Sequence, residues 1–448
     1  MIVSLMKNRF TPRPRLTDYL VAIVLVLVPF QAFLTIWGST LLGHYTLLRL
    51  WDDAVLTVLL GVASFWLAKD VALRQWFLGS TLVRLILAYT ALSILLGFVS
   101  LIKTEVTPKA LAYGLLVNTR FLLWFLAVFL VAQRSMFLKR ASLDLLFLPT
   151  LIVVIFACLQ YTVLPHNFLA HFGYSQATIA PIETINHNNH YIRVQSTLRG
   201  ANPLGAYLVV ILSAVSVPFA RGRYRILSGI LGVMALFALY ASGSRSAWIG
   251  VVLSLFAIGW IRIKNKQTRL YFGAASLALI LVLAGGYIAL RNNAHIQNEL
   301  LHTQAHSVSK VSSNAAHASA LKDGIKDVIH QPLGDGPGTA GPASEYNTPH
   351  PVRIAENYYV QIAQETGWLG LALFLGILLL VVRELYERAN GSQFALALFA
   401  ALIGVSFVNL LSHAWTDDTL AYLWWGLAGI TLGSVVPKGQ KEVGAGHV

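Results

Sequence analysis

The chain contains little charge and almost no cysteine. Only 12% of its 448 residues are charged and 56% are hydrophobic, whereas an ordinary soluble protein carries about 25% charged residues. The single cysteine, Cys158, lies in an apolar run, which excludes disulfides and thiolate metal sites. No spacing of His, Cys, Asp or Glu resembles a set of metal ligands, so we expect no metal or other cofactor. The sequence therefore predicts an integral membrane protein without a separable soluble domain.

Basic residues, by contrast, are abundant and give a net charge of +14. They recur as short clusters between apolar runs, so they indicate membrane topology and not a surface for nucleic acid. A spanning helix needs about 20 mostly apolar residues, and we expect an all-α fold with about twelve spans. The predicted spans are 19–41, 51–68, 81–102, 109–131, 143–164, 203–219, 225–241, 246–262, 270–290, 357–382, 394–412 and 419–436.

The distribution of charge predicts the orientation. Twenty Lys and Arg lie on the short connections of one side, and eleven lie on the other side, seven of them in two long loops. Positive short loops mark the cytoplasm, so we expect a multi-pass membrane protein with both termini cytoplasmic. The basic start of the chain could belong to a signal peptide, but the following apolar stretch is too long and is expected to be an uncleaved span. The predicted parts are the N-terminus 1–18, the membrane domain 19–436, the extracytoplasmic loops 165–202 and 291–355, and the tail 437–448.

The first long loop ends in two arginines. Arg193 and Arg199 flank a short polar stretch before a helix expected to begin near Pro203, and proline fits the first helical turn because it has no N–H to lose. Free N–H groups at that helix start, beside two guanidinium groups, suit a phosphate or diphosphate. Alternatively, both arginines pair with lipid headgroups or with a loop carboxylate such as Glu183.

Further candidates lie in the next turn and in the second loop. Arg245 sits in a tight turn among three serines, as a ligand in a small polar nest or as a surface anchor. A helix is predicted from about Ser312 to His330, with Ser312 or Ser313 as its N-cap. His317 falls on the apolar face of this helix, where a histidine is usually a packed residue. Its place beside the expected anion ligands keeps a functional role open.

Glu356 closes the second loop at the mouth of a span. An ionisable residue there is costly unless it is paired or used, so Glu356 is a candidate base for a sugar hydroxyl. Asn357 and Tyr358 would then supply hydrogen bonds to a substrate. Alternatively, Glu356 and Asn357 simply cap the helix that follows.

Charged residues also occur at or inside the predicted spans. Arg120 lies in the middle of the fourth span, where it must face a cavity or a partner. Asp52 and Asp53 begin the second span, and Arg49 is spaced to pair with them. The remaining, weaker candidates are His413, Asp417 and Asp418 in the last outward loop, whereas His187 and His190 are too loosely placed to form a site.

Taken in order, these phrases resemble the O-antigen ligase/polymerase superfamily, whose shared domain is labelled Wzy_C. The similarity covers about residues 190–375. It rests on Arg193 with Ser196-Thr197 and Asn202-Pro203, the turn Ser244-Arg245-Ser246-Ala247, the run Pro332-Leu333-Gly334 with Gly336 and Gly338, and Glu356-Asn357-Tyr358-Tyr359 with Gly367 and Gly370. Many ligases have His at the position of Glu356 and Arg at the position of His317, and His350 lies close enough in sequence to compensate.

The resemblance implies a GT-C-like, metal-independent, inverting glycosyltransferase. Members move a glycan from undecaprenyl diphosphate to a glycan, lipid or protein acceptor outside the inner membrane. By this similarity Arg193, Arg199 and Arg245 hold the diphosphate, and Glu356, with His317, is catalytic. Asn357, Tyr358 and Arg120 are further substrate-binding candidates, and the partners are the lipid-linked glycan, the acceptor and membrane lipids, without nucleic acid.

Two other functions fit a polytopic protein. A transporter of bicarbonate or of a sugar acid would place its site near the midplane on broken helices, and only Arg120 fits that position. A flippase or scaffold of envelope assembly would not need Glu356 beside arginines. The sequence does not distinguish a ligase from a polymerase, because no acceptor pocket is recognisable.

Overall fold

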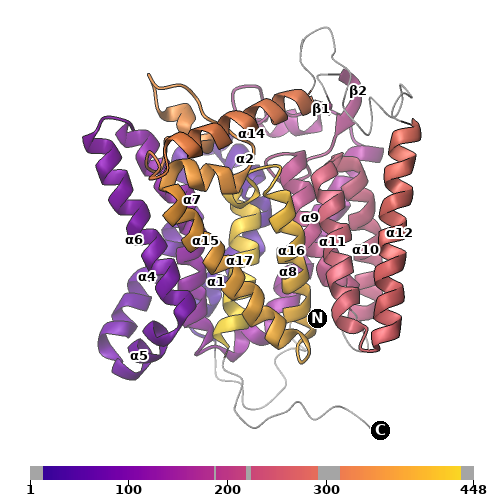
Figure 1. Cartoon of the computed structure of the whole chain (residues 1–448), viewed down its shortest axis with the longest axis horizontal. Helices are drawn as coiled ribbons and strands as arrows, with labels where there is room; N and C mark the ends of the chain where they lie inside the picture. Colours follow the sequence, from indigo (N-terminus) through magenta and orange to yellow (C-terminus); the bar gives the residue numbers. More distant parts are fainter. Residues whose placement is uncertain (1–13, 186–187, 218–222, 291–312, 435–448) are drawn as a thin grey trace.

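The computed structural model describes residues 14–185, 188–217, 223–290 and 313–434, and these form a bundle of helices lying side by side (Figure 1). Apolar runs fold as helices here because a bilayer offers no water to hydrogen-bond the backbone, so each segment must satisfy its own N–H and C=O groups. Within the described ranges, eight helices are long and apolar enough to span a membrane. They are Leu16–Leu42, Trp51–Lys69, Thr81–Ile102, Pro108–Gln133, Met136–Thr162, Arg225–Ser242, Arg245–Arg262 and Tyr358–Ala389.

Each of the twelve predicted spans overlaps a helix, which confirms a mainly α-helical, multi-pass membrane protein. Four of these helices fall outside the set of eight: α9 (Ala201–Ser216), α12 (Lys266–Leu290), α16 (Gln393–Val408) and α17 (Asp418–Gly433). Of these, α9 and α16 are shorter apolar helices. Twelve spans therefore remain a prediction.

The N-terminal half of the bundle is built from consecutive helices joined by short connections. Pro29 in the 3₁₀ turn η2 (Val28–Phe30) separates the two halves of the first span, because proline lacks an N–H and breaks the ladder of helical hydrogen bonds. The other elements are α1 (Leu16–Leu27), α2 (Gln31–Leu42), α3 (Tyr45–Arg49), α4 (Trp51–Lys69), α5 (Val71–Gly79), α6 (Thr81–Ile102), α7 (Pro108–Ala132) and α8 (Met136–Thr162).

The centre of the bundle is the contact of α7 with α17. A Cβ added at Gly433 of α17 would lie 2.1 Å from the carbonyl oxygen of Phe129 on α7, so glycine is what allows the two backbones to approach so closely. Trp124 on α7 and Trp425 on α17 are fully buried, and the indole Nε1 of Trp124 donates to the Tyr422 carbonyl at 2.9 Å. This packed core holds the elements that carry the site.

One end of the bundle carries the loops, and we name it the loop end. There β1 (Glu183–Ile185) and β2 (Asn188–Arg193) pair antiparallel, with Glu183 opposite Arg193. The helix α14 (Ser313–His330) lies across the same end (Figure 1), which confirms the helix predicted in the second loop, whereas Ser312 is outside the described residues. The other elements are η3 (Phe168–Phe172), α10 (Arg223–Ser242), α11 (Arg245–Arg262), η5 (Gly341–Tyr346) and η6 (Ala414–Thr416).

The long helix α15 (Tyr358–Ala389) is interrupted at Gly367, which has φ 66° and ψ −171°. The loop after α14 enters this break: the N–H of Trp368 donates to the Pro332 carbonyl at 3.0 Å, and the N–H of Gly336 donates to the Glu365 carbonyl at 2.8 Å. The break therefore joins the second loop to α15. The segment that contains Glu356 is held at its start by these hydrogen bonds and at its end by α15 itself.

Candidate functional site

The segment that carries Arg193 and Arg199 is pinned into the bundle. Ser196 has a positive φ of 54°, and its hydroxyl donates to the Val153 carbonyl of α8 at 2.8 Å. The neighbouring Thr197 hydroxyl donates to the Pro29 carbonyl at 2.8 Å. Both side chains are buried. Because this strained turn is held in place, the side chains of Arg193 and Arg199 point in different directions.

Arg193 is partly buried at the end of β2 and has a defined orientation. Its Nε donates to the Ser242 carbonyl at 2.8 Å, and its Nη2 donates to Asn202 Oδ1 at 2.5 Å. Glu183 Oε2 lies 4.0 Å from Nη1. Burial lowers the pKa of Arg193, an effect that Glu183 partly opposes, but an arginine remains charged at neutral pH. Arg193 is thus a preorganised cation.

The expected anion site at the start of α9 differs from the prediction. The helix begins at Ala201, two residues before Pro203, and the Ala201 N–H donates to Glu183 Oε1 at 3.1 Å. A carboxylate at a helix N-terminus takes the place that a phosphate would occupy. The prediction of free N–H groups was therefore wrong, because the hairpin brings Glu183 to this position. Glu183 also confirms the alternative of a loop carboxylate beside Arg193.

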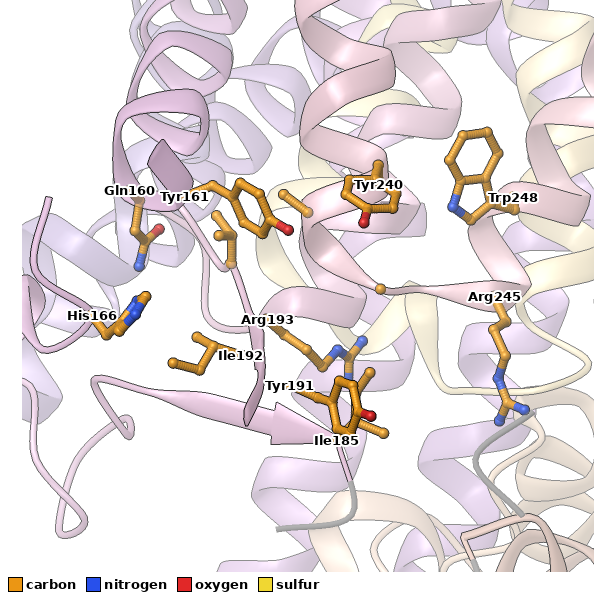
Figure 2. A pocket seen from close by; sticks show the side chains of 13 residues that line it. Gln160, Tyr161, His166, Ile185, Tyr191, Ile192, Arg193, Tyr240, Arg245 and Trp248 are labelled. Atoms are coloured by element: carbon orange, nitrogen blue, oxygen red, sulfur yellow. The ribbon is translucent and has the colours of Figure 1, made fainter. Parts of the chain in front are cut away.

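Arg193 and Arg245 line one cavity of about 720 Å³ at the loop end. Its wall combines these two cations with aromatic side chains of α8, α10 and α11. Figure 2 shows both guanidinium groups on one side of the cavity and the rings of Tyr161, Tyr240 and Trp248 on the other. Two arginines beside amphipathic rings form a site for a phosphate attached to a sugar or an apolar chain.

The second half of the site is a contact between α14 and the start of α15. His317 Nδ1 contacts Glu356 Oε2, and both side chains are partly exposed, at 45% and 40%. Glu356 also has a positive φ of 50°, a conformation that costs an ordinary residue about 1–2 kcal/mol. Strain of this kind persists where the surroundings impose it and is common at functional sites.

Arg245 connects the two halves electrostatically. The pKa of His317 is lowered, first by burial and second by the positive charge of Arg245. The imidazole is therefore neutral at pH 7, so it can donate one N–H to Glu356 and keep a lone pair on the other nitrogen. The structure thus places a carboxylate and a neutral imidazole within the electrostatic reach of the cationic cavity.

Two predicted substrate ligands have structural roles. Asn357 is the N-cap of α15: its Oδ1 accepts from the N–H groups of Tyr359 and Val360, and its Nδ2 donates to the Leu410 carbonyl at 3.0 Å. Tyr358 is fully buried against Phe374. Neither side chain lines the cavity of Arg193 and Arg245, so substrate binding by these two residues stays a prediction.

Arg120 also has a structural environment. It is buried, lies 3.6 Å from Asp53 through Nη1 and contacts Asp418 through Nη2. This arrangement favours a structural role, and the assignment of Arg120 as a substrate ligand stays a prediction. It also corrects the expected pairing of Arg49 with Asp52 and Asp53. Arg49 instead donates to Tyr113 Oη at 3.1 Å and lies 3.9 Å from Asp418.

Arg199 faces a different cavity from Arg193. It lies 3.7 Å from Asp417, and a small cavity between α2, α3 and α17 is lined by Arg199, Asp417 and Asp418. His413 is nearby: burial, and then the charge of Arg199, lowers its pKa to about 4. The structure therefore separates the two arginines that the sequence grouped together.

The remaining predicted ligands lie elsewhere. His350 points away, with its Nε2 3.1 Å from the Thr104 carbonyl oxygen. His187 is outside the described residues, and nothing is described of the side chain of His190. In the parts of the chain that the structure describes, no group of three His, Cys, Asp or Glu side chains could hold a metal ion.

Sequence reasoning missed Glu365, a fully buried carboxylate in α15. Its Oε1 accepts from the Gly338 N–H at 2.7 Å and its Oε2 accepts from Asn118 Nδ2 at 2.5 Å. It therefore anchors the second loop to α7 and α15. A carboxylate inside a predicted span was the available signal. The aromatic wall of the cavity was missed because tyrosines and tryptophans near span ends also mark membrane interfaces.

Comparison with known proteins identifies one domain. Residues 230–375 match the family Wzy_C, described as O-antigen ligase. The matched part includes Arg245, His317 and Glu356 and begins after Arg193 and Arg199. No curated protein matches the chain significantly. Residues 230–375 are thus a Wzy_C O-antigen ligase domain, and the family is of a glycosyltransferase type. This match confirms the resemblance seen in the sequence.

Proposed function

We propose that the protein transfers a glycan from undecaprenyl diphosphate to an acceptor hydroxyl, and that the loop end faces the outside of the bacterial inner membrane. The observation that carries this proposal is the arrangement of two cations and a carboxylate–imidazole pair. Arg193 and Arg245 share one cavity, and His317, which Arg245 influences electrostatically, contacts Glu356. The cations suit the diphosphate, and the pair suits the hydroxyl.

The donor half of the proposal concerns charge on the leaving group. The diphosphate lies at Arg193 and Arg245, and the bond between the anomeric carbon and the phosphate oxygen breaks during transfer. Negative charge then grows on that oxygen. Donors that are already oriented stabilise such charge most effectively, and the hydrogen bonds of Arg193 to Ser242 and Asn202 hold its guanidinium in one orientation.

The acceptor half concerns one proton. The acceptor oxygen forms the new bond to the anomeric carbon from the face opposite the diphosphate, which inverts the configuration. Its proton passes to Glu356, and the N–H that His317 donates to this carboxylate holds it in position. The products are the glycosylated acceptor and undecaprenyl diphosphate. No metal is required, because the arginines balance the charge of the diphosphate.

The competing proposal, an anion transporter, has less support. It depended on Arg120 at the midplane, and Arg120 is buried between Asp53 and Asp418. A bound anion would have to displace one of these carboxylates. The candidate anion ligands that line a cavity, Arg193 and Arg245, lie at the loop end.

The test is transfer by purified protein in lipid vesicles. Labelled undecaprenyl-diphosphate glycan is mixed with glycan, lipid or protein acceptors, with and without EDTA. We expect label on one acceptor class, release of undecaprenyl diphosphate, and no effect of EDTA. A ladder of products would indicate a polymerase and a single transfer a ligase. Uptake of a free anion without any transfer would reject the proposal in favour of transport.

A further inference from the structure

The helix α14 has an unusual exposed side. Ile325 and Ile329 lie four residues apart on it, and Leu333 follows in the loop after the helix, which ends at His330. Ile329 is 65% exposed and Leu333 is 80% exposed. We call Ile325, Ile329 and Leu333 the apolar flank. Exposed apolar side chains in a row mark a surface that contacts a partner or a membrane.

The rest of α14 is arranged as in an interfacial helix. Its buried face packs on α15, where a Cβ added at Gly324 would lie 2.9 Å from the Val360 Cγ1. Lys322 and Lys326 are exposed, on the side that the helical repeat places away from Gly324. A helix with one apolar side and lysines at its polar side lies in the plane of a lipid–water interface, with the ammonium groups toward the headgroups.

A groove of about 630 Å³ lies beneath the apolar flank, between α14, α15 and α16. Polar groups at its edge are already paired: Asn357 Nδ2 donates to the Leu410 carbonyl at 3.0 Å, and the Tyr359 hydroxyl donates to the Ser406 carbonyl at 3.1 Å. The groove therefore suits a hydrocarbon chain and not a polar ligand. Its lining includes Ile325, Val328, Ile329, Val360, Leu371 and Phe407.

This groove continues into the membrane-facing surface of the bundle. Trp368 and Leu375 line it, and these residues, with Leu369 and Leu379, are exposed along α15. Because α15 is long and apolar enough to span a membrane, this surface contacts lipid chains. Figure 1 shows α14 lying across the loop end, above α15 and α16. Lipid chains beside α15 therefore reach the groove without crossing water.

We propose that α14 lies in the lipid–water interface at the loop end and that an acyl chain of a phospholipid of that leaflet fills the groove beneath it. One consequence, which rests on the proposed function, concerns His317. It lies on the same helix eight residues before Ile325, about 12 Å at 1.5 Å per residue. The bilayer thus helps to position His317 against Glu356.

The test uses spin labels and needs no substrate. Single cysteines replace Ile329 or Leu333 on the apolar flank, or Ser319 on the exposed polar side, in a Cys158→Ser background. In vesicles of phosphatidylglycerol and phosphatidylethanolamine, labels at 329 and 333 should be accessible to oxygen and shielded from a soluble nickel complex. The label at 319 should show the reverse. Nickel access at 329 and 333 equal to that at 319 would overturn the proposal.

The consequence for His317 is tested separately with Ile329→Glu and its control Ser319→Glu. A carboxylate in the groove should displace the lipid chain and slow glycan transfer, whereas the same charge at 319 should not. Equal transfer rates in both variants, with labels shielded as expected, would overturn the coupling to His317. A parent protein without any transfer would overturn the proposed function, while the label accessibilities would still decide the position of α14.

Discussion

The carboxylate of Glu356 contacts the imidazole Nδ1 of His317, although the two residues are separated by a long stretch of loop. Glu356 has a left-handed backbone conformation immediately before the N-cap of α15. If this position served only to lead the chain into the helix, a glycine or an asparagine there would avoid the strain. A glutamate at this position, in contact with an imidazole, favours the chemical role of the pair.

The pH dependence of transfer should report on His317. Burial and Arg245 lower its pKa below the ordinary 6.5, so the imidazole is neutral above about pH 6.5. It gains a proton only as the pH falls through the lowered pKa, and transfer should decline there because an imidazolium beside Glu356 makes the carboxylate a weaker base. The pKa of His413 is also lowered, to about 4, so the effects of the two histidines must be separated by substitution. The pH profile of kcat/KM checks this, and His317→Gln should lose the acid limb; an unchanged limb would assign it to another group.

Arg193 and Arg199 should differ in importance. Arg193→Ala should abolish donor binding, and Arg193→Lys should restore it only partly because a single ammonium cannot replace the guanidinium fork. Arg199→Ala should have a smaller effect, since Arg199 lies against Asp417 in another cavity. Binding of labelled donor to vesicles measures both. The control is Lys109→Ala, which removes a cation packed over Tyr346 outside the cavity. Equal losses in Arg193→Ala and Arg199→Ala would show that both arginines hold the diphosphate.

Arg120 should be required for stability. Arg120→Met leaves Asp53 and Asp418 without their buried partner, and removing one partner of a buried ion pair costs about 3–5 kcal/mol. Thermal unfolding in detergent should therefore show a clear decrease in Tm. Arg84→Met, which changes an exposed arginine, is the control and should leave the Tm unchanged. Normal stability of Arg120→Met with lost donor binding would return Arg120 to the substrate site.

We expect that neither glutamine nor alanine can replace Glu365 without a loss of stability. Both of its oxygens accept hydrogen bonds, from Gly338 and Asn118. In Glu365→Gln the side-chain NH₂ would face one of these two donors, and that donor would lose its acceptor. Each buried donor left unpaired costs about 1–3 kcal/mol. The midpoint of thermal unfolding should fall for Glu365→Gln and stay constant for Glu345→Gln, a control at an exposed carboxylate. Equal midpoints would show that Glu365 does not anchor the loop.

Much of the fold could be predicted because apolar length determines where a membrane helix forms. The helix α14 was predicted from its spacing of apolar residues, and its position across the loop end explains why His317 meets Glu356. The interruption of α15 at Gly367 was not predicted, although the polar residues Gln364, Glu365 and Thr366 come directly before it. It depends on the N–H groups of a distant loop, such as that of Gly336, which pair with carbonyls near the break.

The site was predicted less well, because its geometry depends on tertiary contacts. Arg193 and Arg199 are six residues apart, but the buried turn at Ser196 directs them into different cavities. The start of α9 was expected to be open, and only the pairing of β1 with β2 brings Glu183 to it. Glu356 and His317 were each recognisable as ionisable residues near a membrane surface, whereas their contact required the path of the loop.

The most direct test of the account is a single-turnover measurement on Glu356→Gln. Labelled lipid-linked glycan is first bound to the reconstituted protein, acceptor is then added, and formation of the glycosylated product is followed by chemical quench. General base catalysis contributes about 10²–10⁴-fold, so the transfer step should slow by about that factor while donor binding stays near that of the parent. Glu356→His, with the residue common among ligases, should retain part of the activity. Transfer by Glu356→Gln at the parental rate would contradict the account and leave Glu356 as a residue that only precedes the helix cap.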